Sequence, residues 1–284
     1  MENNSSRKQE IRRLLSMSPE AVMRQAGERL VVCRDVEALY ARMADDILHE
    51  IQQTAARKQP LRLILPVGPT GQYPLLADRI NSEGLSLAHC WFYFMDEYCD
   101  ENGAALDAEH PLSFKGAAQR LFLNRLHPHA KLDSARVIFP DENNIHSLRA
   151  QIEAADGIDT CYGGIGIHGH VAFNEPEPGV RSMGCRQVKL NDFTVTINAI
   201  RSQVGGNLEG FPHRAYTLGM EEILAAKQIR LYCRNGSEYD WANTVLRLAL
   251  FGEPGDDYPV THIRDRNYVI ITDEVTLQSP RVIV

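Results

Sequence analysis

Short apolar runs alternate along the chain with longer segments in which apolar and polar residues recur at helical spacing. The runs expected to form strands are 30–33, 61–65, 91–95, 137–139, 159–163, 215–218, 229–233 and 268–271. The segments expected to form helices are about 35–57, 73–80, 112–126, 145–155, 221–226 and 239–250. Strands joined by helix-length segments need crossover connections, which favours an α/β fold with a largely parallel sheet covered on both faces.

Two helix starts are marked by capping residues. Ser18 precedes Pro19, the residue type favoured in a first turn, and Gly27 is a typical stop eight residues later. Asp35 can cap the long helix that follows it. We therefore expect residues 1–30 to form a helical extension, and residues 31–284 to form a single α/β domain, because no linker divides them.

Composition narrows the class of protein. With 44% hydrophobic and 24% charged residues, the chain of 284 residues can bury one substantial core. Its net charge of −7 argues against a general binder of nucleic acid or anionic membranes, although a local cationic pocket is compatible with it. The six cysteines are scattered without a C-x-x-C pair, and we see neither a secretory signal nor an apolar run of membrane-spanning length. We expect a cytoplasmic protein.

Residues 163–176, GGIGIHGHVAFNEP, carry the densest chemistry in the chain. Closely spaced glycines let the backbone turn sharply and approach a ligand, and His168, His170 and Glu175 add titratable groups. The segment follows an apolar run, and the carboxyl ends of strands in an open α/β sheet are where ligands bind. A glycine-rich connection with solvated polar groups is the alternative. So many reactive side chains at one strand exit favour a functional site.

This segment resembles the signature of the glucosamine-6-phosphate deaminase/isomerase family, which is related more distantly to 6-phosphogluconolactonase. Four further matches follow in the family's order: LPVGPTG at 65–71, FMDEY at 94–98, HPLSF at 110–114 and PHRAYTLGM at 212–220. The resemblance implies a Rossmann-like, three-layer α/β/α fold with a mostly parallel, doubly wound sheet. It also implies a sugar-phosphate ligand, no cofactor and a homo-oligomer.

The resemblance assigns catalytic roles. Moving a carbonyl between C1 and C2 of a sugar needs a base that carries a proton between the two carbons, and burial tunes a carboxylate for this task. Asp96 matches the family's proton-shuttling Asp, although an Asp here can also cap a turn. His170 matches the residue that opens the sugar ring, and Glu175 matches the carboxylate that works with it. His168, two residues before His170, is grouped with these catalytic residues.

The expected substrate-binding residues come mainly from the same motifs. In this chain the residues expected to bind the substrate are Gly68, Pro69, Thr70, Gly71, Glu97, Gly169, Asn174 and Arg201. Their counterparts in the family surround the sugar phosphate. Arg201 matches a phosphate-binding Arg only with an offset of one residue. Glu97 is expected to hold the surrounding loop.

Three departures from the family pattern concern charge and hydrogen bonding. His168 replaces an Asp that supports the catalytic imidazole, so His170 loses an anionic partner. Val67 and Pro69 replace a Thr and a Gly in the phosphate loop, which removes a hydroxyl and a backbone N–H. Tyr239 stands near the position of a phosphate-binding Lys, and Arg234 is a candidate replacement. These changes leave the reaction in place and predict an altered anion preference.

Several alternatives remain open. His168 and His170 could form half of a zinc site completed by Asp96, His110 or Glu175, but two histidines at this spacing are weak evidence and we expect no metal. The main prediction is an enzyme that converts an amino-sugar phosphate to a ketose phosphate and ammonia. The alternatives are an aldose–ketose isomerase for a different sugar phosphate or sugar acid, a 6-phosphogluconolactonase-like hydrolase, and a catalytically weakened sugar-binding regulator.

Overall fold

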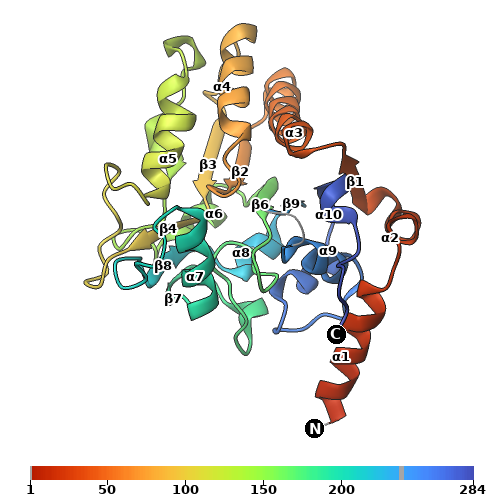
Figure 1. Ribbon diagram of the computed structural model, residues 1–284. Coiled ribbons are helices and arrows are strands. Elements are labelled where there is room, and N and C mark those ends of the chain that lie inside the picture. Colours follow the sequence, from red (N-terminus) through yellow and green to blue (C-terminus); the bar gives the residue numbers. More distant parts are fainter. Residues whose placement is uncertain (1, 237–239) are drawn as a thin grey trace.

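The computed structural model describes residues 2–236 and 240–284, and its core is a seven-stranded, fully parallel sheet (Figure 1). The strand order is β1-β10-β9-β6-β2-β3-β5. These strands are β1 Leu30–Cys33, β2 Leu61–Leu65, β3 Cys90–Phe94, β5 Val137–Ile138, β6 Thr160–Gly164, β9 Gln228–Cys233 and β10 Tyr268–Asp273. The expected doubly wound parallel sheet is confirmed.

Helices cover both faces of this sheet. The described helices are α1 Glu2–Leu15, α2 Pro19–Ala26, α3 Val36–Arg57, α4 Gln72–Glu83, α5 Phe114–Leu121, α6 Leu148–Ala154, α7 Asp192–Arg201, α8 Met220–Ala225, α9 Ala242–Phe251 and α10 Glu274–Leu277. Several begin as the sequence predicts. The Ser18 hydroxyl accepts the Ala21 N–H at 3.2 Å, and the Asp35 carboxylate accepts the Ala38 N–H at 2.8 Å.

The strands alternate their side chains between two hydrophobic layers. Leu63 of β2 and Phe92 of β3 pack with α3, α4 and α5, whereas the adjacent Ile64 and Tyr93 belong to the layer that includes α6, α8 and α9. Because both faces are buried, β2 is apolar at nearly every position rather than alternating in polarity. The three-layer α/β/α architecture follows from this double burial.

The winding of the sheet reverses between β2 and β6. From β2 the chain moves outward to β3 and then β5, and it returns to the other side of β2 with β6 before continuing to β9 and β10. Such a reversal leaves a crevice at the carboxyl ends of the two central strands, where open α/β sheets bind ligands. The segments 66–71 and 165–175 leave the sheet at this crevice.

A second, antiparallel sheet lies beside the first. Its order is β4-β8-β7, with β4 Asp96–Cys99, β7 Arg186–Lys189 and β8 Arg214–Thr217. The strand expected at 215–218 therefore exists but does not join the main parallel sheet. We did not predict β4, β7 or α7 from the sequence.

Several helix boundaries differ from the prediction. The helix expected at 112–126 is shorter, because Ser113 caps its start at Phe114 and the chain changes to a 3₁₀ turn at Leu123–Arg125. The helix expected at 145–155 is confined to α6. Tyr239, where the last predicted helix was to begin, lies outside the described residues, and α9 starts at Ala242.

The N-terminal helices pack against the C-terminal part of the chain. Leu14 and Val22 are fully buried in the same layer as α9, and Arg7 forms an ion pair with Asp257 at 2.8 Å. The fully buried Arg247 donates a hydrogen bond to the Met17 carbonyl, which links α9 to the segment between α1 and α2. The division into a 1–30 extension and a 31–284 domain stays a prediction. None of the helices in the described part of the chain has both the length and the apolar character of a membrane span.

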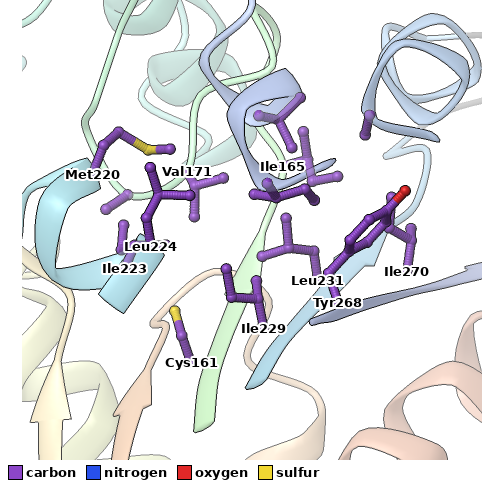
Figure 2. Close-up of a cluster of buried hydrophobic side chains, with 14 of the residues drawn as sticks. Cys161, Ile165, Val171, Met220, Ile223, Leu224, Ile229, Leu231, Tyr268 and Ile270 are labelled. Carbon is purple, nitrogen blue, oxygen red and sulfur yellow. The ribbon is translucent and has the colours of Figure 1, made fainter. Parts of the chain in front are cut away.

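The layer around β6 and β9 supports the loop that carries His170. Figure 2 shows Leu231 and Ile229 of β9 in the same cluster as Ile165 and Val171, which follow β6, and the α8 side chains Ile223 and Leu224. Leu231 is fully buried, and its Cδ2 lies 3.1 Å from where a Cβ on Gly163 would stand. Close packing of this kind fixes the position at which the chain leaves β6.

Leu231→Ala should therefore lower the free energy of unfolding by about 2–5 kcal/mol, because it leaves a cavity at the centre of this layer. Urea denaturation followed by circular dichroism measures the change. Val275→Ala, at a side chain that is 51% exposed, serves as the control and should stay within about 0.5 kcal/mol of wild type. A loss for Leu231→Ala no larger than that of the control would contradict the packing described here.

Candidate functional site

A cavity of about 400 Å³ opens at the crevice where the sheet reverses. Its walls come from the segments after β2, β3, β6 and β9, together with the last two turns of α7. Of the residues predicted for the site, those that line the cavity are Gly68, Pro69, Thr70, Asp96, His170 and Arg201, joined by Val67 and Arg234. The strand ends thus bring together residues from distant motifs.

Asp96 begins β4, directly after the chain leaves the parallel sheet. The N–H of the preceding Met95 still donates to the Leu65 carbonyl at 3.0 Å, so Asp96 is held at the end of β3. Only 6% of its surface is exposed. Burial raises the pKa of the Asp96 carboxyl well above its usual range, and the neighbouring Glu97 carboxyl raises it further. Asp96 is consequently a weak acid held at the wall of the cavity.

Glu97 points away from the cavity and binds the start of α5. Its carboxylate accepts the N–H groups of Phe114 at 2.9 Å and Lys115 at 2.7 Å, and the Ser113 hydroxyl at 3.0 Å. Burial raises the pKa of Glu97, while these hydrogen bonds oppose that rise. A buried acceptor at a helix N-terminus fixes β4 against α5, which agrees with the expected loop-holding role.

His170 sits in a tight loop built from glycines. Gly166 donates its N–H to the His170 carbonyl at 2.9 Å, and Gly169, with φ of 66°, donates to the Gly166 carbonyl at 2.9 Å. A Cβ on Gly166 would collide with the imidazole, so glycine is required there. Burial, aided by the charge of His168, lowers the pKa of His170 to about 3. The imidazole is therefore neutral at pH 7.

His168 is half-buried on the outer side of the same loop. Its ring centroid lies 6.3 Å from that of His170 and 5.3 Å from the ring of Phe193 on α7, in an edge-on arrangement. Burial lowers the pKa of His168. The neighbouring imidazole therefore adds to the lowering of the pKa of His170, but burial is the larger cause there.

The signature's amide and carboxylate bind the protein chain instead of lining the cavity. Glu175 accepts the Asn191 N–H at 2.8 Å, just before α7, and burial raises its pKa. Asn174 is fully buried, donates to the carbonyls of Val171 and Leu218, and accepts from Arg186. Among the described residues, neither Nδ1 of His170 nor Oε1 of Glu175 has a hydrogen-bond partner. Glu175 instead ties the signature to α7.

The phosphate-loop segment shapes the cavity floor through its backbone. A Cβ on Gly164 would lie 2.6 Å from the Gly68 carbonyl oxygen, so the ends of β2 and β6 approach closely only because residue 164 is glycine. Gly71 does not line the cavity and packs on the ring of Tyr40, which any Cβ there would strike. Gly169 likewise faces Tyr258 and Val260. Pro69 supplies a carbonyl, bonded to Gln72 at 2.7 Å, but no N–H.

Two arginines form the cationic side of the cavity. The Arg201 guanidinium stacks on the Trp241 ring, with Cζ 3.8 Å from the ring centroid, and pairs with Asp240 at 3.0 Å. Arg234 lies over the ring of Tyr40, 5.4 Å from its centroid. Burial lowers the pKa of Arg201, opposed by the charge of Asp240, and Arg234 contributes to the lowering.

Sequence reasoning missed several polar and aromatic residues that line the cavity, among them Tyr98, Asn198, Tyr232 and Trp241. Asn198 of α7 donates to the Tyr98 hydroxyl at 3.0 Å, and Tyr232 donates to Asp46 of α3 at 2.9 Å. Tyr98 follows Asp96 by two residues on a strand, and residues at this spacing face the same side. This spacing could have identified Tyr98 as a residue of the cavity. Asn198 lies on α7, which was not predicted.

No group of three or more His, Cys, Asp and Glu side chains in the described part of the chain is arranged to hold a metal ion. His110, one of the candidate ligands, accepts the Leu112 N–H through Nδ1 at 3.1 Å.

The neutral state of His170 can be tested by NMR. Its ring signals in a labelled sample, assigned with His170→Gln, should not titrate between pH 8 and pH 5, because its pKa is about 3. In the unfolded state the imidazole of His170 takes up a proton below about pH 6.5, whereas in the native state it stays unprotonated at that pH. The contribution of His170 to stability is thus fully present above about pH 6.5 and is lost as the pH falls toward 3. Titration of His170 near pH 6.5 would contradict the buried geometry.

Comparison with known proteins gives the chain its family. No family model matches it. A glucosamine-6-phosphate deaminase of Porphyromonas gingivalis is 29% identical over 265 residues, covering 87% of this chain and 91% of that protein. The glucosamine-6-phosphate deaminase of Rhodopirellula baltica is 30% identical over 210 residues, covering 72% of this chain and 78% of that protein.

Solved structures show the same fold. A monomeric glucosamine-6-phosphate deaminase superposes with a TM-score of 0.73 at 23% identity, covering 87% of this chain and 98% of that one. A 6-phosphogluconolactonase from Thermotoga maritima superposes with a TM-score of 0.62 at 14% identity, covering 86% of this chain and 99% of that one. On the identity and coverage of its relatives, the chain belongs to the glucosamine-6-phosphate deaminase family.

Proposed function

We propose that this protein is a sugar-phosphate isomerase/deaminase that converts an amino-sugar phosphate into a ketose phosphate and ammonia. The observation that carries the proposal is that Asp96 and His170 line the same cavity as Arg201 and Arg234. The cavity thus combines two buried proton-transfer groups with a cationic region for an anionic ligand. The names of the sequence relatives support the same reaction.

Ring opening is assigned to His170. A neutral imidazole can accept the proton of the anomeric hydroxyl and return it to the ring oxygen as the bond between C1 and that oxygen breaks. The pKa of about 3 keeps the imidazole unprotonated across the working pH range, and it also makes His170 a weak base. The loop of Gly166 and Gly169 holds the ring in place.

Isomerisation is assigned to Asp96. As a carboxylate it removes the proton from C2 and delivers it to C1, while one amine proton is lost and the C1 oxygen gains one. C1 thereby becomes an alcohol and the amine-bearing carbon becomes an imine. Water then adds to the imine and ammonia leaves, so that a ketone remains at C2. Burial suits Asp96 to both halves of this transfer, because a raised pKa makes the carboxylate a stronger base. Glu97 fixes the strand that carries it, and we propose that His168 and Glu175 position the loop and α7.

Three alternatives are distinguished by what they produce: two make other products and the third makes none. An aldose–ketose isomerase would convert a sugar phosphate or sugar acid without releasing ammonia. A hydrolase of the 6-phosphogluconolactonase type, a possibility raised by the fold neighbour, would open a lactone and release an acid. A regulator would bind a sugar phosphate without turning it over. The proton shuttle expected of Asp96 favours the deaminase over the hydrolase, because lactone hydrolysis needs no transfer between two carbons.

A substrate panel tests the proposal directly. Ammonia release and ketose phosphate formation should both occur with an amino-sugar phosphate, and neither should require an added metal or cofactor. The panel should include glucosamine 6-phosphate, neutral glucosamine, aldose phosphates and 6-phosphogluconolactone. Acid release from the lactone, or ketose formation without ammonia, would replace the proposal with the corresponding alternative.

Asp96→Asn should reduce turnover by about 10²–10⁴-fold, because the amide cannot accept the C2 proton. Its nearly equal shape should leave the fold and ligand affinity largely unchanged. The measurement is kcat on an active substrate, with ligand binding by calorimetry and unfolding by circular dichroism as controls. Turnover near the wild-type rate in a folded Asn variant would remove Asp96 from the role.

A further inference from the structure

Arg201 is fixed in the cavity wall by two residues, Gly236 and Trp241, of the segment that joins β9 to α9. Its guanidinium stacks on Trp241, and it packs so closely on the backbone of Gly236 that a Cβ there would collide with it. Trp241 donates its indole N–H to the carbonyl of Ile165 at 3.3 Å, which ties this stacking partner to the segment after β6. The plane of the guanidinium is therefore set by its surroundings before any ligand enters.

One edge of that guanidinium is already occupied by a carboxylate. Nη2 of Arg201 donates to Asp240 at 3.0 Å, in a pair whose side chains are 38% and 13% exposed respectively. Asp240 is itself held in place, because it accepts the Ala242 N–H at 3.0 Å at the start of α9. Asp240 thus presents an anion to Arg201 from a fixed position beside the cavity.

The net positive charge around this pair is smaller than the negative charge of a phosphate ester. Arg201 and Arg234 both line the cavity and carry two positive charges, and Asp240 cancels one, which leaves one net positive charge. A phosphate monoester carries close to two negative charges at pH 7. Asp240 keeps its charge in either case, so the two arginines can both bind the phosphate fully only when Arg201 turns its Nη2 from Asp240 to the ligand.

We propose that Asp240 is an internal competitor for Arg201, which the phosphate group of the ligand displaces, so that Asp240 weakens and tunes anion binding. The identity of the ligand rests on the proposed function, whereas the competition between Asp240 and an anion does not. Asp240 is in this sense a specificity-determining residue. With the pair intact the site favours one negative charge, and with the pair broken it accepts two.

Asp240→Asn tests the proposal, since the amide keeps an oxygen that can accept the Ala242 N–H and loses the charge. Binding of inorganic phosphate and of glucosamine 6-phosphate, measured by calorimetry at low ionic strength, should tighten by about five- to tenfold. The gain should shrink as salt is added, because salt screens the competing charge. Asp240→Ser, which also keeps an acceptor, provides a second neutral variant should the Asn variant not fold.

Two controls isolate the contact. Asp265→Asn removes a carboxylate that pairs with Arg181 at 2.7 Å, neither partner lining the cavity, and should leave phosphate binding unchanged. In an Arg201→Gln background, Asp240→Asn should have no effect, because the competition acts only through Arg201.

Unchanged or weaker phosphate binding in the folded neutral variants would overturn the proposal, since it would show that Asp240 merely orients Arg201. An equal gain with Arg201→Gln would also overturn it. Because inorganic phosphate is not turned over, these outcomes are independent of ammonia release. A failed substrate panel with tightened phosphate binding would refute the proposed reaction and leave the role of Asp240 standing.

Discussion

The parallel pairing of β2 with β6 is the constraint on which the rest of the site depends. Among the described strands, the winding of the sheet reverses at this pair, so the ends of β2 and β6 lead to opposite sides and leave a crevice. The crevice stays narrow at its floor because Gly164 has no side chain to push away the Gly68 carbonyl. Asp96, from the end of β3, and His170, from the loop after β6, face one cavity as a consequence of this topology.

Burial then sets the protonation of both groups in a complementary way. It raises the pKa of Asp96 and lowers that of His170, so each is moved toward its neutral form. An Asp in place of His168 would favour the imidazolium, whereas a second imidazole does not. The His168 substitution and the burial of His170 therefore act in the same direction. Burial thus opposes a charge on either group in the wall of this cavity.

Apolar runs and capping residues were enough to predict the parallel sheet and most helices, because strands buried on both faces are continuously apolar. The small sheet was not predictable in this way. Its strand β7, Arg186–Lys189, is half-exposed and mainly polar, and β4 carries two acidic residues. Motifs located the region of the site but not the direction of each side chain. Asp96 and Glu97 are adjacent in one motif, yet successive strand residues face opposite sides, so one lines the cavity and the other binds α5.

Because motifs do not give the direction of side chains, they also did not predict which residues form the cationic wall of the cavity. Val67 and Pro69 lack the hydroxyl and N–H that would bind an anion from the β2 side, and Arg201 and Arg234 lie along the segments from α7 and β9. Guanidinium groups recognise anions through a planar fork, so their orientation matters more than that of a flexible ammonium group. Stacking on Trp241 and Tyr40 supplies that orientation. The orientation of both guanidinium groups in this cavity therefore depends on aromatic residues that lie outside the signature motifs, so the motifs alone did not predict it.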